Sequence, residues 1–221
     1  WSNGATTEDL AAVAAGTYFV TVTDGAGCME MDSITIGEPA PVVVSLTANP
    51  GDSICMGDST ALSATGANTY SWSPGTGLSA TTGSGVDAFP STGTTYQLIG
   101  VDTAGCADTT SIAITVNALP TVAISGTDTI CDGDTTTLTG SGGVSYDWST
   151  GPMTAAIDVF PTTATTYTVT ATDANGCEDT ESVTVAVNAL PTVSFSGNDT
   201  ICIGDTAMLT AAGGNSYNWS S

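Results

Sequence analysis

Residues 166–187 have the sequence TYTVTATDANGCEDTESVTVAV, and this stretch decides the fold of the chain. Polar and apolar residues alternate from Thr166 to Thr172 and again from Ser182 to Val187. Alternation with a period of two predicts strands with one buried face, and the intervening Asp-Ala-Asn-Gly is typical of a tight turn. The stretch therefore predicts an antiparallel hairpin.

The hairpin belongs to a unit that occurs several times in the chain. Each copy has a tyrosine 10 positions before a cysteine, and the pairs are Tyr18 and Cys28, Tyr96 and Cys106, and Tyr167 and Cys177. A second cysteine lies 17 positions before a tryptophan, and these pairs are Cys55 and Trp72, Cys131 and Trp148, and Cys202 and Trp219. A repeat of about 71 to 78 residues is too long for a solenoid turn and predicts small domains in tandem.

Seven short strands fit the unit that begins at Leu119, and no segment has helical periodicity. Six of the strands are assigned to residues 121–124, 135–139, 146–148, 157–160, 166–172 and 182–187. A tryptophan on the third strand and a tyrosine opening the sixth are the arrangement of an immunoglobulin-like β-sandwich. We therefore predict an all-β chain of tandem immunoglobulin-like β-sandwich domains in an elongated array. The predicted core aromatic residues are Trp1, Trp72, Trp148, Trp219, Tyr18, Tyr96 and Tyr167.

The repeat spacing predicts four parts along the chain. Residues 40–118 and 119–189 are complete domains, residues 1–39 are the C-terminal part of one, and residues 190–221 are the N-terminal part of another. The short links 117–120 and 188–191 predict little hinge motion. We expect a segment of a much longer periodic chain. The alternative is that copies join head to tail and complete each other's sandwich.

The composition excludes several functions. The chain has 22 acidic residues and no lysine, arginine or histidine, which gives a formal net charge of -22. Nothing is present to neutralise phosphates, so we expect no binding of nucleic acid or of anionic membrane surfaces. Serine–histidine and cysteine–histidine nucleophile pairs are also absent, and the acidic residues lie on repeated turns, so we predict that the segment is not an enzyme. No apolar run is long enough for direct membrane insertion.

Several stretches resemble repeats of known proteins. Residues 129–135 (TICDGDT) and 167–177 (YTVTATDANGC) resemble the Ig-like and PKD-like repeats of very large secreted Bacteroidota proteins. Residues 1–10 and 16–24 resemble the SprB-type repeat of gliding-motility adhesins. The resemblance implies export by the type IX system and an extracellular role as a cell-surface stalk, adhesin shaft or filament. The alternative function is an array of modules that bind glycans or proteins directly in adhesion.

Six cysteines at fixed repeat positions indicate a disulfide framework in an oxidising compartment. Zinc is disfavoured because Cys-x-x-Cys pairs and histidine are absent. The two cysteines of one unit lie at turns on opposite poles of a sandwich, which strands of about 7 residues separate by more than 20 Å. We therefore favour a bond between Cys55 and Cys177 across a domain junction. The pairs Cys55 with Cys106 and Cys131 with Cys177 within single domains remain the alternative.

Acidic residues flank both cysteines of this predicted junction. Asp52, Asp58, Asp173 and Asp179 have no cation nearby in the sequence. Calcium takes six to eight oxygen ligands from carboxylates and carbonyls, and it is the one cofactor that we consider. Solvated turn aspartates are the competing interpretation.

A further pattern is Asp followed by Ser or Thr and then by an aliphatic residue or Thr. It is similar to the O-glycosylation motif of secreted Bacteroidota proteins, which implies modification at nine positions. They are Ser33, Ser53, Ser59, Thr103, Thr109, Thr129, Thr135, Thr200 and Thr206.

Overall fold

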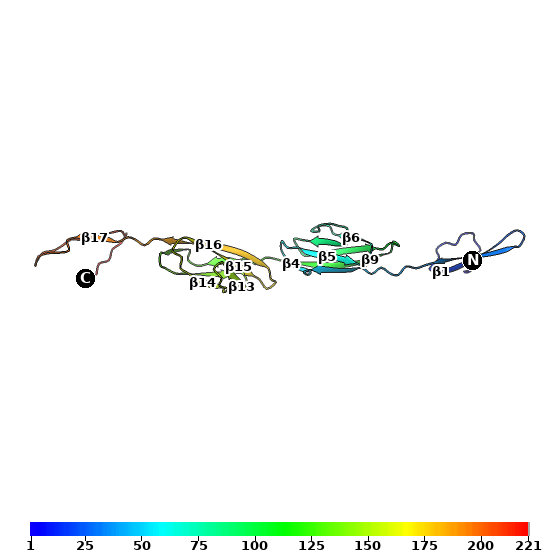
Figure 1. Ribbon diagram of the computed structural model, residues 1–221, viewed down its shortest axis with the longest axis horizontal. Coiled ribbons are helices and arrows are strands. Elements are labelled where there is room, and N and C mark those ends of the chain that lie inside the picture. The colour runs from blue at the N-terminus through cyan, green and yellow to red at the C-terminus, as the bar shows by residue number, and fades with distance from the viewer. Residues whose placement is uncertain (221) are drawn as a thin grey trace. The chain divides into compact units, whose positions relative to one another are not determined.

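The computed structural model describes residues 1–220, and these residues form strands and loops with no helix. No segment in this range is therefore a helix able to cross a membrane. The chain divides into two compact units, Trp1–Val116 and Asn117–Ser221. Each unit contains one seven-stranded sandwich and one separate two-stranded sheet, and Figure 1 labels some of their strands. This confirms the all-β prediction.

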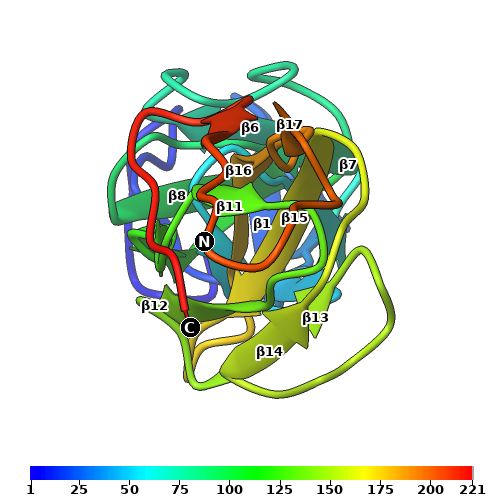
Figure 2. The same cartoon turned by 90° about the vertical axis from the view of Figure 1, so that its left-hand side faces the viewer.

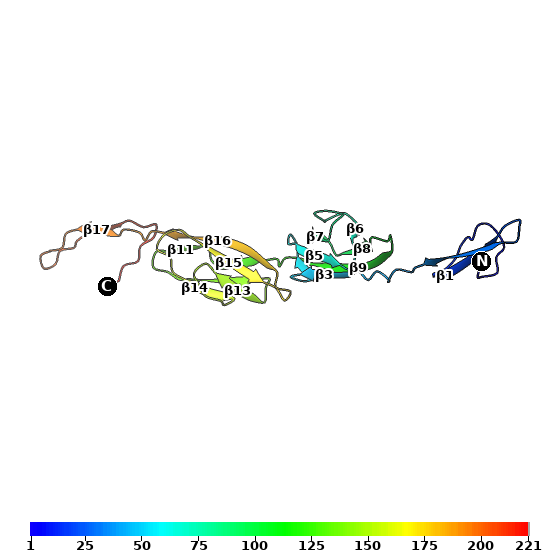
Figure 3. The same cartoon turned by 45° about the vertical axis from the view of Figure 1, so that its right-hand side comes forward.

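The sandwich of the first unit has two sheets. The three-stranded sheet has the order β3-β5-β7, with β3 at Ser45–Asn49, β5 at Thr60–Thr65 and β7 at Gly85–Ala88. The four-stranded sheet has the order β4-β9-β8-β6, with β4 at Ser53–Cys55, β6 at Thr69–Ser73, β8 at Thr94–Val101 and β9 at Ala107–Asn117. Figure 3 labels the strands of this sandwich other than β4 from a second side.

The sandwich of the second unit has the same topology. Its sheets have the orders β10-β12-β14 and β11-β16-β15-β13. The first sheet contains β10 (Ala123–Ser125), β12 (Thr136–Ser141) and β14 (Ala156–Val159). The second contains β11 (Thr129–Cys131), β13 (Ser145–Trp148), β15 (Thr165–Thr172) and β16 (Glu178–Asn188), which are labelled in Figure 2.

The core of each sandwich lies between its two sheets. Strands β5 and β12 alternate strictly between buried and exposed residues, as expected for strands with one face in a core. In the first unit, Leu62 of β5, Trp72 of β6 and Leu98 of β8 belong to one buried cluster. In the second unit, Leu138 of β12 and Trp148 of β13 belong to the corresponding cluster. The aromatic and aliphatic residues of each repeat therefore pack between the two layers.

The two remaining sheets have two strands each. In the first unit β1 (Gly16–Thr23) pairs antiparallel with β2 (Met29–Ile36). In the second unit β17 (Ser194–Gly197) pairs antiparallel with β18 (Leu209–Ala212). The sequence predicts four parts that end at residues 39, 118, 189 and 221, whereas the structure divides into only two compact units. The four-part division therefore stays a prediction.

Two boundaries differ from those that the sequence predicts. The first strand, predicted at residues 121–124, is β10, and it is followed by an additional strand, β11, to which the sequence assigned no strand; β10 joins one sheet and β11 joins the other, where it pairs parallel with β16. Gly126, with a φ of +143°, lies between them, in a backbone conformation that side chains rarely adopt. Strand β16 also begins at Glu178 rather than at residue 182, because the turn is tight enough for pairing to start immediately after Cys177.

Candidate functional site: the cysteine turns

One hairpin turn carries the second cysteine of each repeat, and it has the same geometry three times. In residues 173–177, Oδ1 of Asp173 accepts hydrogen bonds from the backbone N–H groups of Asn175 (2.8 Å) and Cys177 (2.9 Å). The Asp173 N–H donates in turn to the Cys177 carbonyl (2.9 Å). Asp102 and Asp24 hold their turns through the equivalent bonds to Cys106 and Cys28. The aspartate therefore fixes the place of the cysteine in each hairpin.

The first cysteine of each repeat begins a different turn, and Cys55 and Cys131 also end the short strands β4 and β11. The carbonyls of Cys55, Cys131 and Cys202 accept hydrogen bonds from the N–H groups of residues 58, 134 and 205, at 3.0, 3.0 and 3.1 Å. A glycine with positive φ occupies the third turn position in each case, at +98° for Gly57 and +94° for Gly133. Three copies of one turn thus present three cysteines in one local conformation.

The two cysteine turns lie at opposite ends of one sandwich. In the second unit Cys131 is paired with Asn188, the last residue of β16, whereas Cys177 directly precedes the first residue of this strand. Strand β16 has 11 residues, which at about 3.3 Å per residue places the two turns roughly 30 Å apart. A disulfide requires Cα atoms within about 7 Å. A bond between Cys131 and Cys177 is therefore sterically excluded within this sandwich.

The oxidation states of the cysteines agree with this geometry. Cys55 and Cys177 are each disulfide-bonded. The thiols of the other four are free, and they are Cys28, Cys106, Cys131 and Cys202. The alternative intradomain pairs, Cys55 with Cys106 and Cys131 with Cys177, are thus wrong for this structure, since each includes a free thiol.

The turn geometry predicts a pH-dependent contribution to stability. Hydrogen bonds, first of all the bond from the Cys177 N–H, hold the pKa of Asp173 below its ordinary value of 3.8. A carboxyl group with a depressed folded-state pKa stabilises the fold above its unfolded pKa, and this contribution is lost as the pH falls through the folded value. We expect Asp173→Asn to flatten the decline in thermal unfolding temperature below pH 4, measured by calorimetry. Asp132→Asn, in a different turn, is the control, and an unchanged profile for Asp173→Asn would contradict the assignment.

Calcium binding stays a prediction. Among residues 1–220 no group of three or more Cys, Asp, Glu or His side chains is arranged to hold a metal ion. Of the four predicted ligands, Asp173 already accepts two backbone bonds through Oδ1, and Oδ1 of Asp179 accepts one from the Thr180 N–H (2.8 Å). Asp52 and Asp58 are exposed on the turn around Cys55.

The predicted core aromatic residues fall into two groups. Trp72, Tyr96, Trp148 and Tyr167 are buried in the two sandwich cores. The Nε1 of Trp148 donates to the Thr154 carbonyl (2.9 Å), and the Tyr96 hydroxyl donates to the Thr76 carbonyl (2.9 Å). Desolvation raises the pKa of Tyr96. These side chains pack the cores and leave no aromatic platform at these positions.

Trp219 requires a correction. It is 55% exposed, and the β17–β18 sheet that precedes it in the sequence is two-stranded in the part of the chain that the structure describes. Trp1 and Tyr18 are half-buried, Tyr18 within β1, and both belong to neither core cluster. A repeated aromatic residue is therefore buried only where both sheets of the sandwich are present. The spacing of residues in the sequence does not reveal whether the second sheet is there.

The nine predicted glycosylation positions share one property, since each of these serine and threonine residues is exposed. Four lie close to the first cysteine of a repeat: Ser53 and Thr129 begin the short strands β4 and β11, and Ser59 and Thr135 follow the cysteine turns. Exposure leaves each hydroxyl accessible, so modification stays a prediction that the fold permits.

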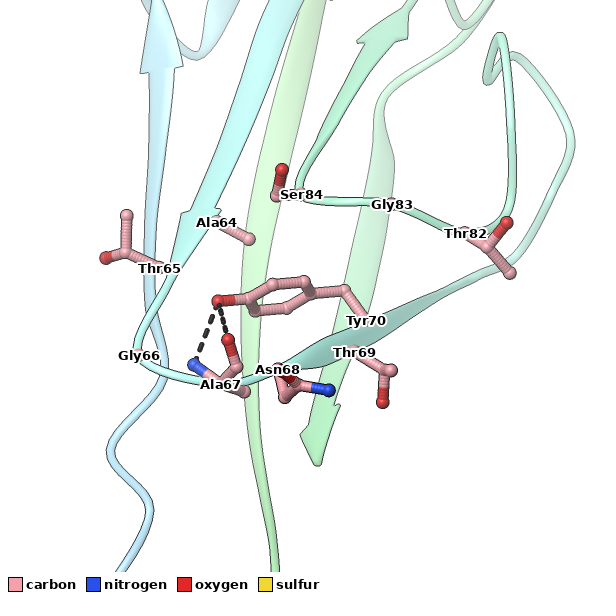
Figure 4. Close-up of a pocket in the computed structure, with 10 residues that line it drawn as sticks. All are labelled: Ala64, Thr65, Gly66, Ala67, Asn68, Thr69, Tyr70, Thr82, Gly83 and Ser84. Carbon is pink, nitrogen blue, oxygen red and sulfur yellow. Dashed lines mark hydrogen bonds between the residues drawn. The ribbon is translucent and has the colours of Figure 1, made fainter. Parts of the chain in front are cut away.

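A surface depression of about 670 Å³ lies at one end of the first sandwich, where residues 64–70 turn between β5 and β6 (Figure 4). Its only aromatic lining residue is Tyr70, whose hydroxyl accepts from the Ala67 N–H (2.8 Å) and donates to the Ala67 carbonyl (2.9 Å). Tyr146 makes the equivalent pair of bonds with Gly143. The turn that the tyrosine closes beside this depression is thus a repeated feature of the fold.

Comparison with known proteins gives structural neighbours only: no family model matches the chain, and no curated protein matches its sequence. One similar structure is a Ca²⁺-stabilised adhesin with which an Antarctic bacterium binds ice, at 20% identity and a TM-score of 0.40 over 82% of this chain and 59% of that one. A 1.5-MDa bacterial ice-binding adhesin is similar at 18% identity and 0.35, over 79% and 74%. Murine CEACAM1b is similar at 11% identity and 0.32, over 67% and 100%. The chain therefore spans less than two thirds of the first of these structures.

Proposed function

We propose that this segment is a non-catalytic structural part of a large extracellular adhesin, in which tandem sandwiches form the shaft. The observation that carries the proposal is that one sandwich, with the same two cysteine turns, is built twice from the repeated sequence. The same domain is repeated, and neither copy has a catalytic site that the other lacks. Such repetition suits a mechanical role more than a catalytic one.

The disulfide-bonded cysteines support an extracellular location. Disulfides persist in oxidising environments and are rare where glutathione and thioredoxin keep thiols reduced. Cys55 and Cys177 are the two bonded cysteines, and we propose that they are partners of each other. Such a bond would be a covalent clamp between successive repeats. It would limit their separation under load while leaving each core independent.

The finer assignment is also a proposal. The resemblance of residues 129–135 and 167–177 to Bacteroidota repeats supports secretion by the type IX system, attachment to the cell surface and a role in adhesion or gliding motility. Exposure of the nine serine and threonine positions supports O-glycosylation of the same surface. Neighbouring repeats are the expected partners, with surface glycans or proteins as partners of other parts of the adhesin.

The proposal predicts the outcome of proteolytic shaving of intact cells. Because the chain has no lysine or arginine, trypsin does not cleave it, and we choose a protease that cleaves before aspartate. Such cleavage places the six cysteines on separate peptides, with Cys55 in residues 52–57 and Cys177 in residues 173–178. We expect release of fragments from intact cells and, without reduction, a crosslinked peptide that joins these two.

Two results would count against the proposal in different ways. Fragments obtained only after cell lysis would overturn the surface location. Surface fragments in which residues 52–57 and 173–178 are not crosslinked would overturn the clamp alone. Reduced samples of the same digest are the control for peptide identity.

A further inference from the structure

The two sandwiches differ at one edge of their three-stranded sheets. Strands β7 and β14 are the last strands of these sheets, and they pair with β5 and β12 in the same register. Trp72 is followed by 12 residues before β7, whereas Trp148 is followed by only 7 before β14. The N–H groups of the two tryptophans donate to the carbonyls of Thr81 and Pro152, which places the five additional residues of the first sandwich before Thr81, at 76–80.

This additional segment covers the edge of β7 in the first sandwich. The Ser79 N–H donates to the Asp87 carbonyl (2.8 Å), and the Phe89 N–H donates to the Gly77 carbonyl (2.8 Å). An antiparallel bridge lies between these two bonds. The segment therefore adds a short strand to an edge that would otherwise have unpaired backbone groups.

The same segment covers the tyrosine of the first sandwich. The Tyr96 hydroxyl donates to the carbonyls of Thr76 (2.9 Å) and Gly77 (3.3 Å). A Cβ added at Gly77, which has a φ of +71°, would lie 2.8 Å from the Cα of Pro90 and 2.9 Å from the Tyr96 hydroxyl oxygen. The segment thus fits closely into a groove, and the groove requires glycine at this position.

Residues 119–189 contain no equivalent of the segment, and the corresponding groove of the second sandwich is open. It has a volume of about 530 Å³, and its lining includes Pro161 and Tyr167, which correspond to Pro90 and Tyr96. Tyr167 is 6% exposed, yet its hydroxyl has no hydrogen-bond partner among the residues that the structure describes. A buried hydroxyl that faces such a groove is a donor without its acceptor.

The backbone beside this groove is also unpaired on its outer side. Because the register of β14 matches that of β7, the N–H and carbonyl groups of Asp158 face outward as those of Asp87 do. In the part of the chain that the structure describes, no strand pairs with β14 on this side. The open groove therefore offers the same backbone groups and the same hydroxyl that hold residues 76–79 in the first sandwich, and an extended peptide can bind to them as an added strand.

The charge of the chain restricts what binds there. The chain has 22 acidic residues and no basic residue, and the exposed Asp158 lines the groove. A segment with lysine or arginine is attracted to this surface, whereas a second copy of the chain is repelled. We propose that the β14 edge binds an extended basic segment of a partner protein, in which glycine, an aliphatic residue and serine or threonine take the places of residues 77–79. This inference goes beyond the shaft role, which its failure would leave unaffected.

The test uses the intact chain and a synthetic peptide with the sequence of residues 74–82, PGTGLSATT, between two pairs of lysines. By isothermal titration calorimetry we expect one peptide to bind per chain. Tyr167→Phe should weaken binding about fivefold to tenfold, because one hydrogen bond to the peptide is lost. Tyr96→Phe is the matched control and should bind like the original chain, since residues 76 and 77 already cover the Tyr96 hydroxyl.

Moving the additional segment should change the number of binding sites. Insertion of Thr-Gly-Leu-Ser-Ala after Gly151 should fill the second groove from within the chain and abolish binding. Deletion of residues 76–80 should open the first groove and raise the stoichiometry to two peptides per chain. Circular dichroism that matches the original chain shows that each variant is folded.

Four outcomes would overturn the inference. One is an original chain that does not bind the peptide, and another is an insertion variant that binds it as tightly as the original chain does. A third is equal affinity for a scrambled peptide of the same composition, which would mean that charge alone attracts it. The fourth is a concentration-dependent dimer of the original chain that the insertion variant does not form, which would assign the edge to a second copy.

Discussion

Trp148→Ala is expected to destabilise the second sandwich by about 3–5 kcal/mol. The indole is 2% exposed and belongs to the core cluster that joins both sheets. Its removal leaves a cavity that a close-packed interior fills only in part, and it also removes the hydrogen bond to the Thr154 carbonyl. Because a domain of this size is stable by about 5–15 kcal/mol, this loss is a large share of the total.

Native-state hydrogen exchange measures this effect for each unit separately. Amides of β15 and β16 should lose protection in Trp148→Ala, while amides of β8 and β9 keep it. Phe160→Ala is the control, since Phe160 is 75% exposed and its loss should change stability by no more than about 0.5 kcal/mol. Equal effects of the two substitutions would show that Trp148 does not support the core.

The hairpin and its turn were predictable because their determinants are local. Alternation over residues 166–172 fixes which side chains of β15 are buried, and the chemistry of Asp173 and Gly176 fixes the turn within five residues. The same local rule applies to the copies at Asp24 and Asp102. The place of the second cysteine of each repeat, at the end of a hairpin turn, could therefore be predicted from the sequence alone.

The additional strand β11 was not predictable from periodicity. Strand β11 has three residues and one buried side chain, Ile130, which is too short for an alternating pattern to be recognised. Its partner in β16 is Val187, far along the sequence, and a parallel pairing of this kind is set by the tertiary fold. Gly126 was the available signal, because a glycine between two β-rich segments marks a place where the backbone changes direction.

The cysteine site was predictable in part. Spacing identified both cysteine positions, and an antiparallel sandwich requires them to lie at opposite poles, which the register of β11 with β16 confirms. Spacing did not decide how cysteines of different repeats pair. The exposure of Trp219 was missed for a related reason, since a core position is buried only where the second layer is present.

Gly142→Ala is expected to produce the second large loss of stability. Gly142 has a φ of +100°, and a Cβ added there would lie 2.0 Å from the Thr121 carbonyl oxygen, which belongs to the backbone leading into β10. The left-handed conformation costs an alanine about 1–2 kcal/mol. The overlap adds about 1–3 kcal/mol, because a backbone atom, unlike the end of a side chain, moves only if the pairing of β10 with β12 shifts.

Gly133→Ala separates these two contributions. Gly133 has nearly the same conformation, with a φ of +94°, but an added Cβ would meet no atom within 4 Å. We expect Gly133→Ala to lower the free energy of unfolding only by the conformational cost. Urea unfolding of the two variants then gives the contribution of the steric overlap as the difference between their free energies of unfolding. Gly66 and Gly213 have the same close approach, at 1.9 Å from the carbonyl oxygens of Val43 and Thr192. Equal stability of Gly142→Ala and Gly133→Ala would contradict this prediction. It would mean that the close approach of the Thr121 backbone does not require glycine at position 142, and that glycine there is needed only for the conformation of the turn.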